Sequence, residues 1–285
     1  MTKIFHIGIP KSGTTTIQSI LENDERITLT RSNFFTTSSW WLGEDTSLEK
    51  GKVNIESNET LISGGFSKTK LHDVFDRISK KYPDAKIIVT IRRQEDAILS
   101  MYKYHIKYNF KGVKSLENWM YNTNLGMDYL SLCMYGNIAR LLLLYFKREN
   151  IHFLCFEDLK SDQTKFFKKY YDILGLDYMS KVKEVVKNKT SLNDNQLYTL
   201  SKFNYFSLLK ADSENIPTYK TLSSIERKMR FLLIEIFRFK SPKSFFQIEN
   251  VSGYTNLMKD FKDSNDNLVK LGFIEASKLR MYNYI

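Results

Sequence analysis

The chain has 285 residues, of which 42% are hydrophobic and 14% aromatic, enough to build a substantial core. Its net charge of +11 favours anionic partners such as phosphorylated or sulfated ligands, nucleic acid or anionic lipid surfaces. Two cysteines and four histidines, with no CxxC pair, exclude the usual zinc-binding patterns, and no uncharged apolar run approaches the length of a membrane span.

Strands and helices alternate along most of the chain. The apolar run at residues 3–8 predicts a short buried strand, and Ile17, Ile20 and Leu21 mark one face of a helix over residues 14–23. In chain order we then expect a strand at 52–56, helix 71–82, strand 86–91, helix 95–108, helix 125–148, strand 151–156 and a helix at 163–174 closed by Gly175.

This alternation predicts an α/β fold, with a parallel β-sheet flanked by helices on both faces. The part after about residue 180 is predicted to be mostly helical, and no linker composition separates it from the rest. We therefore expect a single domain over 1–285, with a core of about 1–180 and a helical C-terminal extension over about 181–285.

The loop between the first strand and the first helix has the pattern of an anion-binding turn. Gly8 and Gly13 frame residues 9–12, and the N–H groups and dipole of the following helix favour negative charge. Nucleoside-triphosphate hydrolases carry Lys and Ser/Thr directly after the second glycine, where this chain has Thr14-Thr15. The lysine stands inside the loop, at Lys11, so the pattern predicts a phosphate cradle for a different kind of ligand.

The segment Pro10-Lys11-Ser12-Gly13-Thr14-Thr15-Thr16 resembles the 5′-phosphosulfate loop, PKSGTT, of sulfotransferases that use 3′-phosphoadenosine 5′-phosphosulfate (PAPS). The resemblance implies a sulfotransferase fold of the P-loop type. It also implies that Lys11 stabilises the bridging oxygen of the leaving group. The 5′-phosphate would be held by Ser12, Gly13, Thr14, Thr15 and Thr16.

A second motif follows the strand at 86–91. In the same family this strand ends in an Arg, with a Ser eight residues later, and the two hold the 3′-phosphate of PAPS. Arg92 and Ser100 have that spacing, and the carboxyl end of a parallel strand faces the ligand crevice of an open sheet. Arg93 is the neighbouring alternative.

Weaker resemblances involve the segment Phe153–Leu159, which ends in Glu-Asp-Leu, and Lys187–Ser191, which resembles a basic stretch near the nucleotide in bacterial relatives. The first also fits a core strand followed by a helix cap at Asp158 or Ser161.

An acceptor hydroxyl needs a general base. The segment Ser57–Leu61 resembles the Ser-x-Glu-x-Leu segment of bacterial sulfotransferases, which makes Glu59 the first candidate and Glu56 the second; His72 and His105 are alternatives. His105 also fits a packing role, and Glu59 also fits a solvated loop carboxylate.

The sequence allows more than one role for two further segments. The aromatic residues Phe34, Phe35, Trp40 and Trp41 fit either an acceptor cleft or core packing. Residues 225–239 carry apolar side chains at helical spacing with basic residues around them, which fits a buried helix, a dimer face or an anionic membrane surface.

The resemblance implies sulfuryl transfer from PAPS to an acceptor hydroxyl on a saccharide or glycolipid, without a metal and with adenosine 3′,5′-bisphosphate (PAP) as product. We expect a cytoplasmic protein, with peripheral contact to the inner face of the membrane as an option, and no nucleic-acid partner. The alternatives are another P-loop transferase, such as a small-molecule kinase, and a basic nucleic-acid-binding protein. The acceptor and the oligomeric state stay open.

Overall fold

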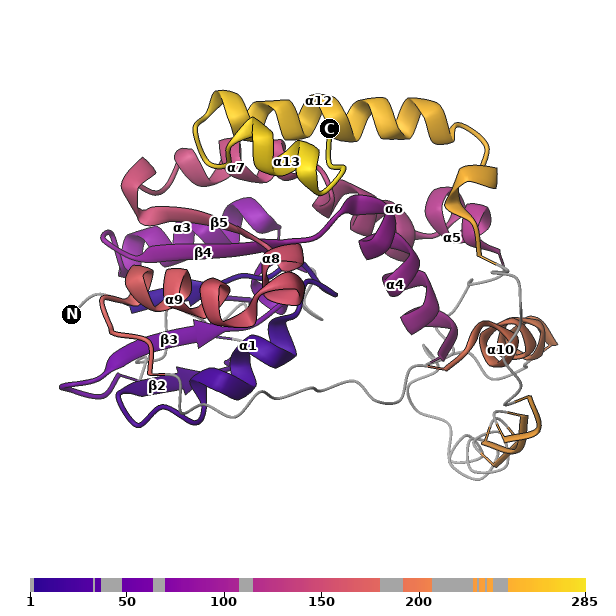
Figure 1. Cartoon of the computed structure of the whole chain (residues 1–285), viewed down its shortest axis with the longest axis horizontal. Helices are drawn as coiled ribbons and strands as arrows, with labels where there is room; N and C mark the ends of the chain where they lie inside the picture. The colour runs from indigo at the N-terminus through magenta and orange to yellow at the C-terminus, as the bar shows by residue number, and fades with distance from the viewer. Residues whose placement is uncertain are drawn as a thin grey trace. The chain divides into compact units, whose positions relative to one another are not determined.

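The computed structural model describes residues 3–32, 34–36, 48–63, 70–107, 115–179, 192–206, 228–229, 231–233, 235–237 and 246–285 (Figure 1). The chain divides into two compact units. The sheet unit takes in Met1–Ala97, Leu132–Lys187 and Lys259–Ile285, and the helical unit takes in Ile98–Ser131 and Asn188–Met258.

The sheet unit is built on five parallel strands. They are β1 (Lys3–His6), β2 (Ile27–Thr30), β3 (Val53–Ser57), β4 (Lys86–Ile91) and β5 (Ile151–Cys155), in the order β2-β3-β1-β4-β5. The predicted parallel sheet flanked by helices is confirmed, and the strand at 86–91 has the predicted bounds. The strand at Ile27–Thr30 was not predicted, because two of its four residues are threonines and its side chains are only half-buried beyond Ile27.

Helices of the sheet unit are α1 (Thr14–Leu21), α2 (Thr60–Ser63), α3 (Leu71–Lys81), α7 (Tyr135–Leu143), α8 (Phe156–Ser161), α9 (Gln163–Leu174) and α13 (Ala276–Met281). Short 3₁₀ turns are η1 (Phe34–Thr36) and η2 (Arg148–Asn150). Helices α4 (Gln94–Lys107) and α12 (Tyr254–Lys270) contain residues of both units. The helical unit holds α5 (Leu116–Asn122), α10 (Asp194–Phe206), η3 (Ile248–Asn250) and all but the last residue of α6 (Asn124–Leu132).

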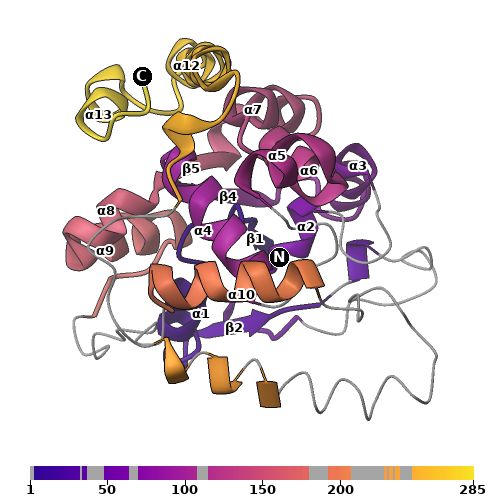
Figure 2. The ribbon, with the colours of Figure 1, turned by 90° about the vertical axis from the view of Figure 1, so that its right-hand side faces the viewer.

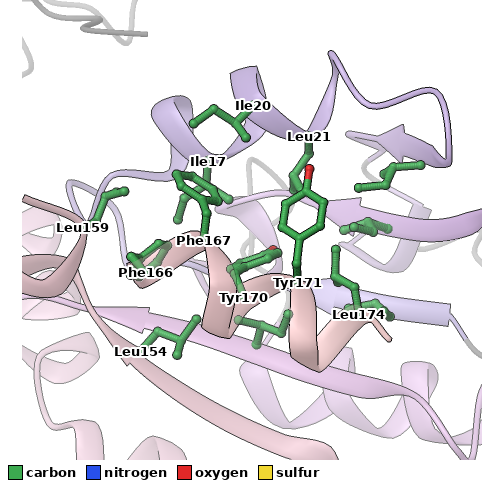
Figure 3. Packing of buried hydrophobic residues seen from close by; sticks show 14 residues of the cluster. Ile17, Ile20, Leu21, Leu154, Leu159, Phe166, Phe167, Tyr170, Tyr171 and Leu174 are labelled. Atoms are coloured by element: carbon green, nitrogen blue, oxygen red, sulfur yellow. The ribbon is translucent and has the colours of Figure 1, made fainter. Parts of the chain in front are cut away.

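One face of the sheet is covered by α1 and α9 (Figure 3). Because side chains alternate along a strand, Ile4, Ile55 and Ile88 point to the same face. The helices bring Ile17, Ile20 and Leu21 from α1 and Phe166, Phe167, Tyr170, Tyr171 and Leu174 from α9. Each such side chain contributes about 1.5–3 kcal/mol by leaving water, so this layer is a main anchor of α1.

Aromatic residues fill the other face of the sheet. The Phe5 ring meets the Phe35 ring edge-on at 5.4 Å between centroids, and Phe75 of α3 packs on Phe146 at 6.1 Å. Phe35 is fully buried, so it packs in the core and does not line an acceptor cleft. Trp40 and Trp41 lie outside the described residues, as does Lys187–Ser191.

The helical stretch predicted over 125–148 is helical but not continuous. The chain forms α6, breaks at Cys133-Met134, forms α7, and ends in η2. Helix α6 starts at a local cap, where the Thr123 hydroxyl accepts a hydrogen bond from the Gly126 N–H at 3.0 Å. Continuous apolar periodicity hid this break, since both helices bury residues at similar spacing.

Helices α12 and α13 lie side by side (Figures 1 and 2), and α12 packs on α7. The Gly136 N–H donates to the Ser264 hydroxyl at 3.0 Å, and a Cβ on Gly136 would lie 2.1 Å from the Ser264 carbonyl oxygen. The close approach of these two helices therefore depends on a glycine.

None of the helices in the described part of the chain combines the length and the apolar character that a membrane span needs. In the segment 225–239, the described side chains of Met229, Leu232, Ile236 and Phe237 are exposed, which contradicts the buried-helix interpretation for them.

Gly136→Ala tests the α7–α12 contact. We expect a loss of about 1–3 kcal/mol in the free energy of unfolding, because backbone on α12 has to move away from the new methyl group. Urea unfolding measures it, with the exposed neighbour Asn137→Ala as the control that stays within about 0.5 kcal/mol of the parent. Equal stability of the two variants would contradict the close packing.

Candidate functional site

The site lies at the carboxyl ends of β1 and β4. These strands are neighbours, but the chain leaves β1 toward β2 and leaves β4 toward β5, on opposite sides. Ligands of open α/β sheets bind at such a switch point, in the crevice outside the strand ends. The loop after β1 and Arg92 after β4 are both at this place, as the sequence predicted.

The β1–α1 loop continues along β4 before it turns. The N–H groups of Ile7 and Ile9 donate to the carbonyls of Ile88 and Thr90 at 2.9 and 3.0 Å. The buried Ser12 hydroxyl then donates to the Ile9 carbonyl at 2.6 Å and lies 2.8 Å from the Thr90 hydroxyl. Ser12 thus connects the loop to β4, and its hydroxyl group is engaged in these two contacts.

Glycine is required at both ends of the loop. A Cβ on Gly8 would lie 2.6 Å from the hydroxyl oxygens of both Thr14 and Thr90. Gly13 has φ 88°, a left-handed conformation, and its Cβ would lie 2.8 Å from the Phe156 ring. Lys11 adopts φ 74° without being glycine, which costs of order 1 kcal/mol and is more frequent at functional sites.

The loop leads directly into the N-terminus of α1, whose first N–H groups have no partner within the helix. Among the described residues, no hydrogen bond engages the N–H groups of Gly13, Thr14 or Thr15. The Thr14 hydroxyl is also buried without a hydrogen-bond partner. Unpaired donors at a helix N-terminus, on a turn that holds Gly8 and Gly13, suit an anion.

Arg92 reaches across to this loop. Its Nη1 donates to the Lys11 carbonyl at 3.1 Å, and its guanidinium lies 4.9 Å from the centroid of the Phe156 ring, a cation–π contact. Its Nε is buried and has no hydrogen-bond partner. An unsatisfied buried donor on a cation is expensive, so a site for an acceptor atom is expected beside it.

Arg93 points to other partners. Its Nε and Nη2 each lie 3.0 Å from an oxygen of Asp96, and Glu95 is 3.7 Å away. The carboxylates of Asp96, Glu95 and Glu157 raise the pKa of the Arg93 guanidinium. Between the two neighbours, it is therefore Arg92 that contacts the loop, which favours Arg92 over Arg93 as the predicted phosphate ligand.

Ser100 lies in α4 within the helical unit, whereas Arg92 belongs to the sheet unit. The pairing of Arg92 with Ser100 therefore stays a prediction. Thr15 and Thr16 lie in the first turn of α1, with Thr15 exposed.

Glu59 lies next to the loop, at the start of α2. Burial raises the pKa of its carboxyl above 4.5, while the Thr14 hydroxyl and the positive charge of Lys11 act in the opposite direction. The Thr14 hydroxyl is near enough to affect this pKa without forming a hydrogen bond of ordinary geometry. Glu59 thus joins Lys11 and Thr14 in one site.

Glu56, the second candidate base, is used for structure. Its carboxylate is fully buried, pairs with Lys3 at 3.6 Å and accepts hydrogen bonds from the Thr30 hydroxyl at 2.7 Å and the Ser32 N–H at 2.6 Å. These contacts argue against Glu56 as the general base, because both of its oxygens are engaged away from solvent.

The histidine alternatives have other surroundings. His105 is buried in the helical unit, where its Nδ1 accepts from the Trp119 indole at 2.8 Å, so it packs. His72 is exposed on α3 and lies edge-on to Tyr145. The two cysteines are buried and free, and burial raises the pKa of both thiols to about 12.

A buried polar network that was not predicted lies beneath the loop. His6 Nδ1 is 2.8 Å from the Ser57 hydroxyl and its Nε2 is 3.3 Å from the Thr90 hydroxyl. Gln18 of α1 donates to the Ser57 carbonyl at 2.9 Å. Burial lowers the pKa of His6 to about 3, so the ring is neutral and links β1, β3 and β4 through hydrogen bonds. A signal was available, since polar residues at the ends of buried strands need partners.

Sequence reasoning also misjudged the segment after β5. Neither Asp158 nor Ser161 caps a helix: α8 begins at Phe156, and Asp162 caps α9 by accepting from the Lys165 N–H at 2.9 Å. Phe156, which supports Arg92, was missed as a site residue. Its place directly after a strand next to β4 was the signal that could have found it.

No group of three or more His, Cys, Asp or Glu side chains positioned to hold a metal ion occurs in the described ranges.

The structural role of Glu56 is tested with Glu56→Gln. The change removes the negative charge that pairs with the buried Lys3, and we expect a loss of about 3–5 kcal/mol in the free energy of unfolding. The control is Glu22→Gln, whose ion pair with Arg31 is half-exposed and screened by solvent. A Glu56→Gln protein with parental stability but no turnover would return Glu56 to the catalytic candidates.

Comparisons with known proteins agree with this architecture. A family model described as "Sulfotransferase domain" matches residues 1–216. The structure of a sulfotransferase from Alicyclobacillus acidocaldarius is 15% identical, with a TM-score of 0.50, and the match covers 85% of this chain and 97% of that one. This likeness shows the fold.

Mouse sulfotransferase SULT7A1 complexed with PAP is 16% identical, with a TM-score of 0.40 and coverage of 99% of this chain and 88% of that chain. No curated protein sequence matches the chain. Because the family model spans more than half of the sequence, the chain belongs to the sulfotransferase family, whose members are enzymes that transfer a sulfuryl group to an acceptor.

Proposed function

We propose that this sulfotransferase takes its sulfuryl group from PAPS and transfers it to a hydroxyl of a saccharide or glycolipid. The observation that carries the proposal is the pair of unsatisfied buried polar atoms at the β1–β4 edge, the Thr14 hydroxyl and Arg92 Nε. They belong to the two motifs that resemble the PAPS site, and a doubly phosphorylated nucleotide supplies acceptor oxygens for both.

The residues present fit the nucleotide. The N–H groups of Gly13, Thr14 and Thr15 suit its 5′-phosphosulfate, together with the hydroxyls of Thr14–Thr16. Ser12 contributes by fixing the loop on Thr90. Arg92, held over Phe156, suits the 3′-phosphate because a guanidinium pairs with phosphate in a two-pronged geometry, with Ser100 as its proposed partner.

In the proposed reaction, the acceptor oxygen forms a bond to sulfur while the bond between sulfur and the bridging oxygen breaks. The bridging oxygen leaves with the electron pair as part of PAP, and Lys11 stabilises its negative charge. Glu59 takes the proton of the acceptor hydroxyl. As in phosphoryl transfer, the protein contributes mainly positioning and charge stabilisation, and this scheme gives no step to a metal.

Glu59 suits the role of base because of its surroundings. Its raised pKa brings it closer to the operating range of a proton acceptor, and the charge of Lys11 keeps the ionised form accessible. A kinase would need a lysine directly after Gly13, and the buried Thr14 stands there instead.

The acceptor class rests on the resemblance of Ser57–Leu61 to bacterial sulfotransferases that modify saccharides. We propose a cytoplasmic location, and peripheral contact with the inner face of the membrane stays an open alternative. Sulfate transfer from PAPS is assayed against a panel of sugars, glycolipids and phenols, and we expect products with the first two. Transfer to phenols alone would contradict the acceptor class and leave the PAPS assignment intact.

Lys11→Ala tests the leaving-group role. We expect kcat to fall roughly 10²–10³-fold while the affinity for PAP changes much less, since the lysine acts on charge that develops during transfer. Single-turnover kinetics and calorimetric binding of PAP measure the two effects. Lys168→Ala, an exposed lysine on α9, is the control. Unchanged turnover in Lys11→Ala would contradict the role.

Glu59→Gln tests the base. We expect kcat to fall about 10²–10⁴-fold with PAP binding retained. The ionised carboxylate is the active form, so in the parent protein activity should be lost as pH falls through a pKa above 4.5. The pH–rate profile of the variant should lack this acidic limb. A variant that keeps the parental rate and profile would assign the base to another residue.

A further inference from the structure

The peptide bond that follows Arg92 is held at both of its polar groups. The Tyr135 hydroxyl donates to the Arg92 carbonyl at 2.6 Å, and the Arg93 N–H donates to Glu157 Oε1 at 2.9 Å. Both groups belong to one planar peptide unit, so these two bonds fix its orientation. The Arg92 side chain leaves the backbone next to this unit, and its direction depends on it.

A residue far along the chain completes the arrangement. The Tyr284 hydroxyl donates to the second oxygen of Glu157, Oε2, at 2.6 Å. Tyr284 is 4% exposed, and burial raises the pKa of its hydroxyl well above 10, so the group stays a hydrogen-bond donor. Glu157 therefore has one oxygen on the Arg93 N–H and the other on Tyr284.

Tyr284 is also linked to the β4–α4 turn through Asn265. Asn265 of α12 donates to the Tyr284 carbonyl at 2.9 Å. The amide of Asn265 also pairs with the amide of Gln94, the first residue of α4, at 2.9 and 3.2 Å. The segment after α13 and the β4–α4 turn thus form one hydrogen-bonded assembly, in which all members lie in the sheet unit.

We propose that Tyr284 is a positioning residue for Arg92, and through it for the 3′-phosphate of the nucleotide; this rests on the proposed function. The physical reason is the charge on Glu157. Without the Tyr284 hydroxyl, this half-buried carboxylate turns its Oε2 toward other donors or water, and its hydrogen bond to the Arg93 N–H weakens. Tyr284 keeps Glu157 on the Arg93 N–H, and this hydrogen bond fixes the peptide unit next to which the Arg92 side chain leaves the backbone.

The chain supplies a matched control. Tyr282, in the same segment, donates its hydroxyl to Asp158 Oδ1 at 2.8 Å, and Asp158 also pairs with Lys278. Asp158 makes no contact with the Arg92–Arg93 peptide unit within the described structure. Tyr282→Phe therefore removes the same kind of bond from the next residue of α8 without reaching Arg92.

The experiment measures the dissociation constants of PAP and of adenosine 5′-monophosphate by calorimetry. The ratio of the two constants reports the 3′-phosphate alone. We expect Arg92→Ala to abolish the preference of the parent protein for PAP, and Tyr284→Phe to reduce it about tenfold with unchanged affinity for the monophosphate. Tyr282→Phe should keep the parental ratio, and Tyr284→Phe should have no further effect in the Arg92→Ala background.

Each other outcome has a definite meaning. A parental ratio in Tyr284→Phe overturns the inference while the proposed function stands. Equal loss of both affinities in Tyr284→Phe also overturns it, because that result belongs to a residue that only supports the fold. A parent protein without preference for PAP overturns the proposed function and the inference together.

Discussion

The hydrogen bond from Arg92 to the Lys11 carbonyl joins two motifs that are 81 residues apart in the sequence. It exists because β1 and β4 pair in parallel, which brings their carboxyl ends to the same edge of the sheet. Without this pairing, the loop after β1 and the arginine after β4 would be separate features. With it, the Arg92 guanidinium, the N-terminus of α1 and Lys11 lie together at the carboxyl ends of β1 and β4.

The carboxyl ends of β1 and β4 are held in place by buried hydrogen bonds as well as by apolar packing. Below the loop, Ser12 and His6 meet at the Thr90 hydroxyl, and every member of this network is buried. Buried polar groups that are satisfied in this way select one geometry, because any shift leaves a donor or acceptor unpaired. The apolar layer formed by α1 and α9 then fixes the helix whose N–H groups face the ligand.

Much of this could be predicted from local signals. The strand at 86–91 is a continuous apolar run, and α9 has clear helical periodicity with a glycine after its last turn, so both have the predicted bounds. The two motifs indicated Lys11 and Arg92, and the contact of Arg93 with Asp96 favours Arg92 over its neighbour. Glu59 likewise stays the first candidate base, since Lys3 and Thr30 hold Glu56.

What could not be predicted depends on contacts between distant parts of the chain. Nothing near Tyr284 in the sequence indicates that it meets Glu157, 127 residues earlier. The packing of Gly136 on Ser264 of α12 joins residues 128 positions apart, which periodicity cannot register. Phe35 is an aromatic residue of the kind that often lines binding sites, but it is buried against Phe5 of strand β1.

Ligand-dependent thermal unfolding tests whether the β1–β4 edge holds the nucleotide of a sulfuryl donor. PAP in the presence of a magnesium chelator is compared with ATP plus magnesium, with both nucleotides at the same molar excess over the protein. At 100 times its dissociation constant, a ligand that binds only the folded state adds about 2.7 kcal/mol of stability. We expect stabilisation by PAP without magnesium and little by ATP. Stabilisation by ATP with magnesium and none by PAP would contradict this expectation.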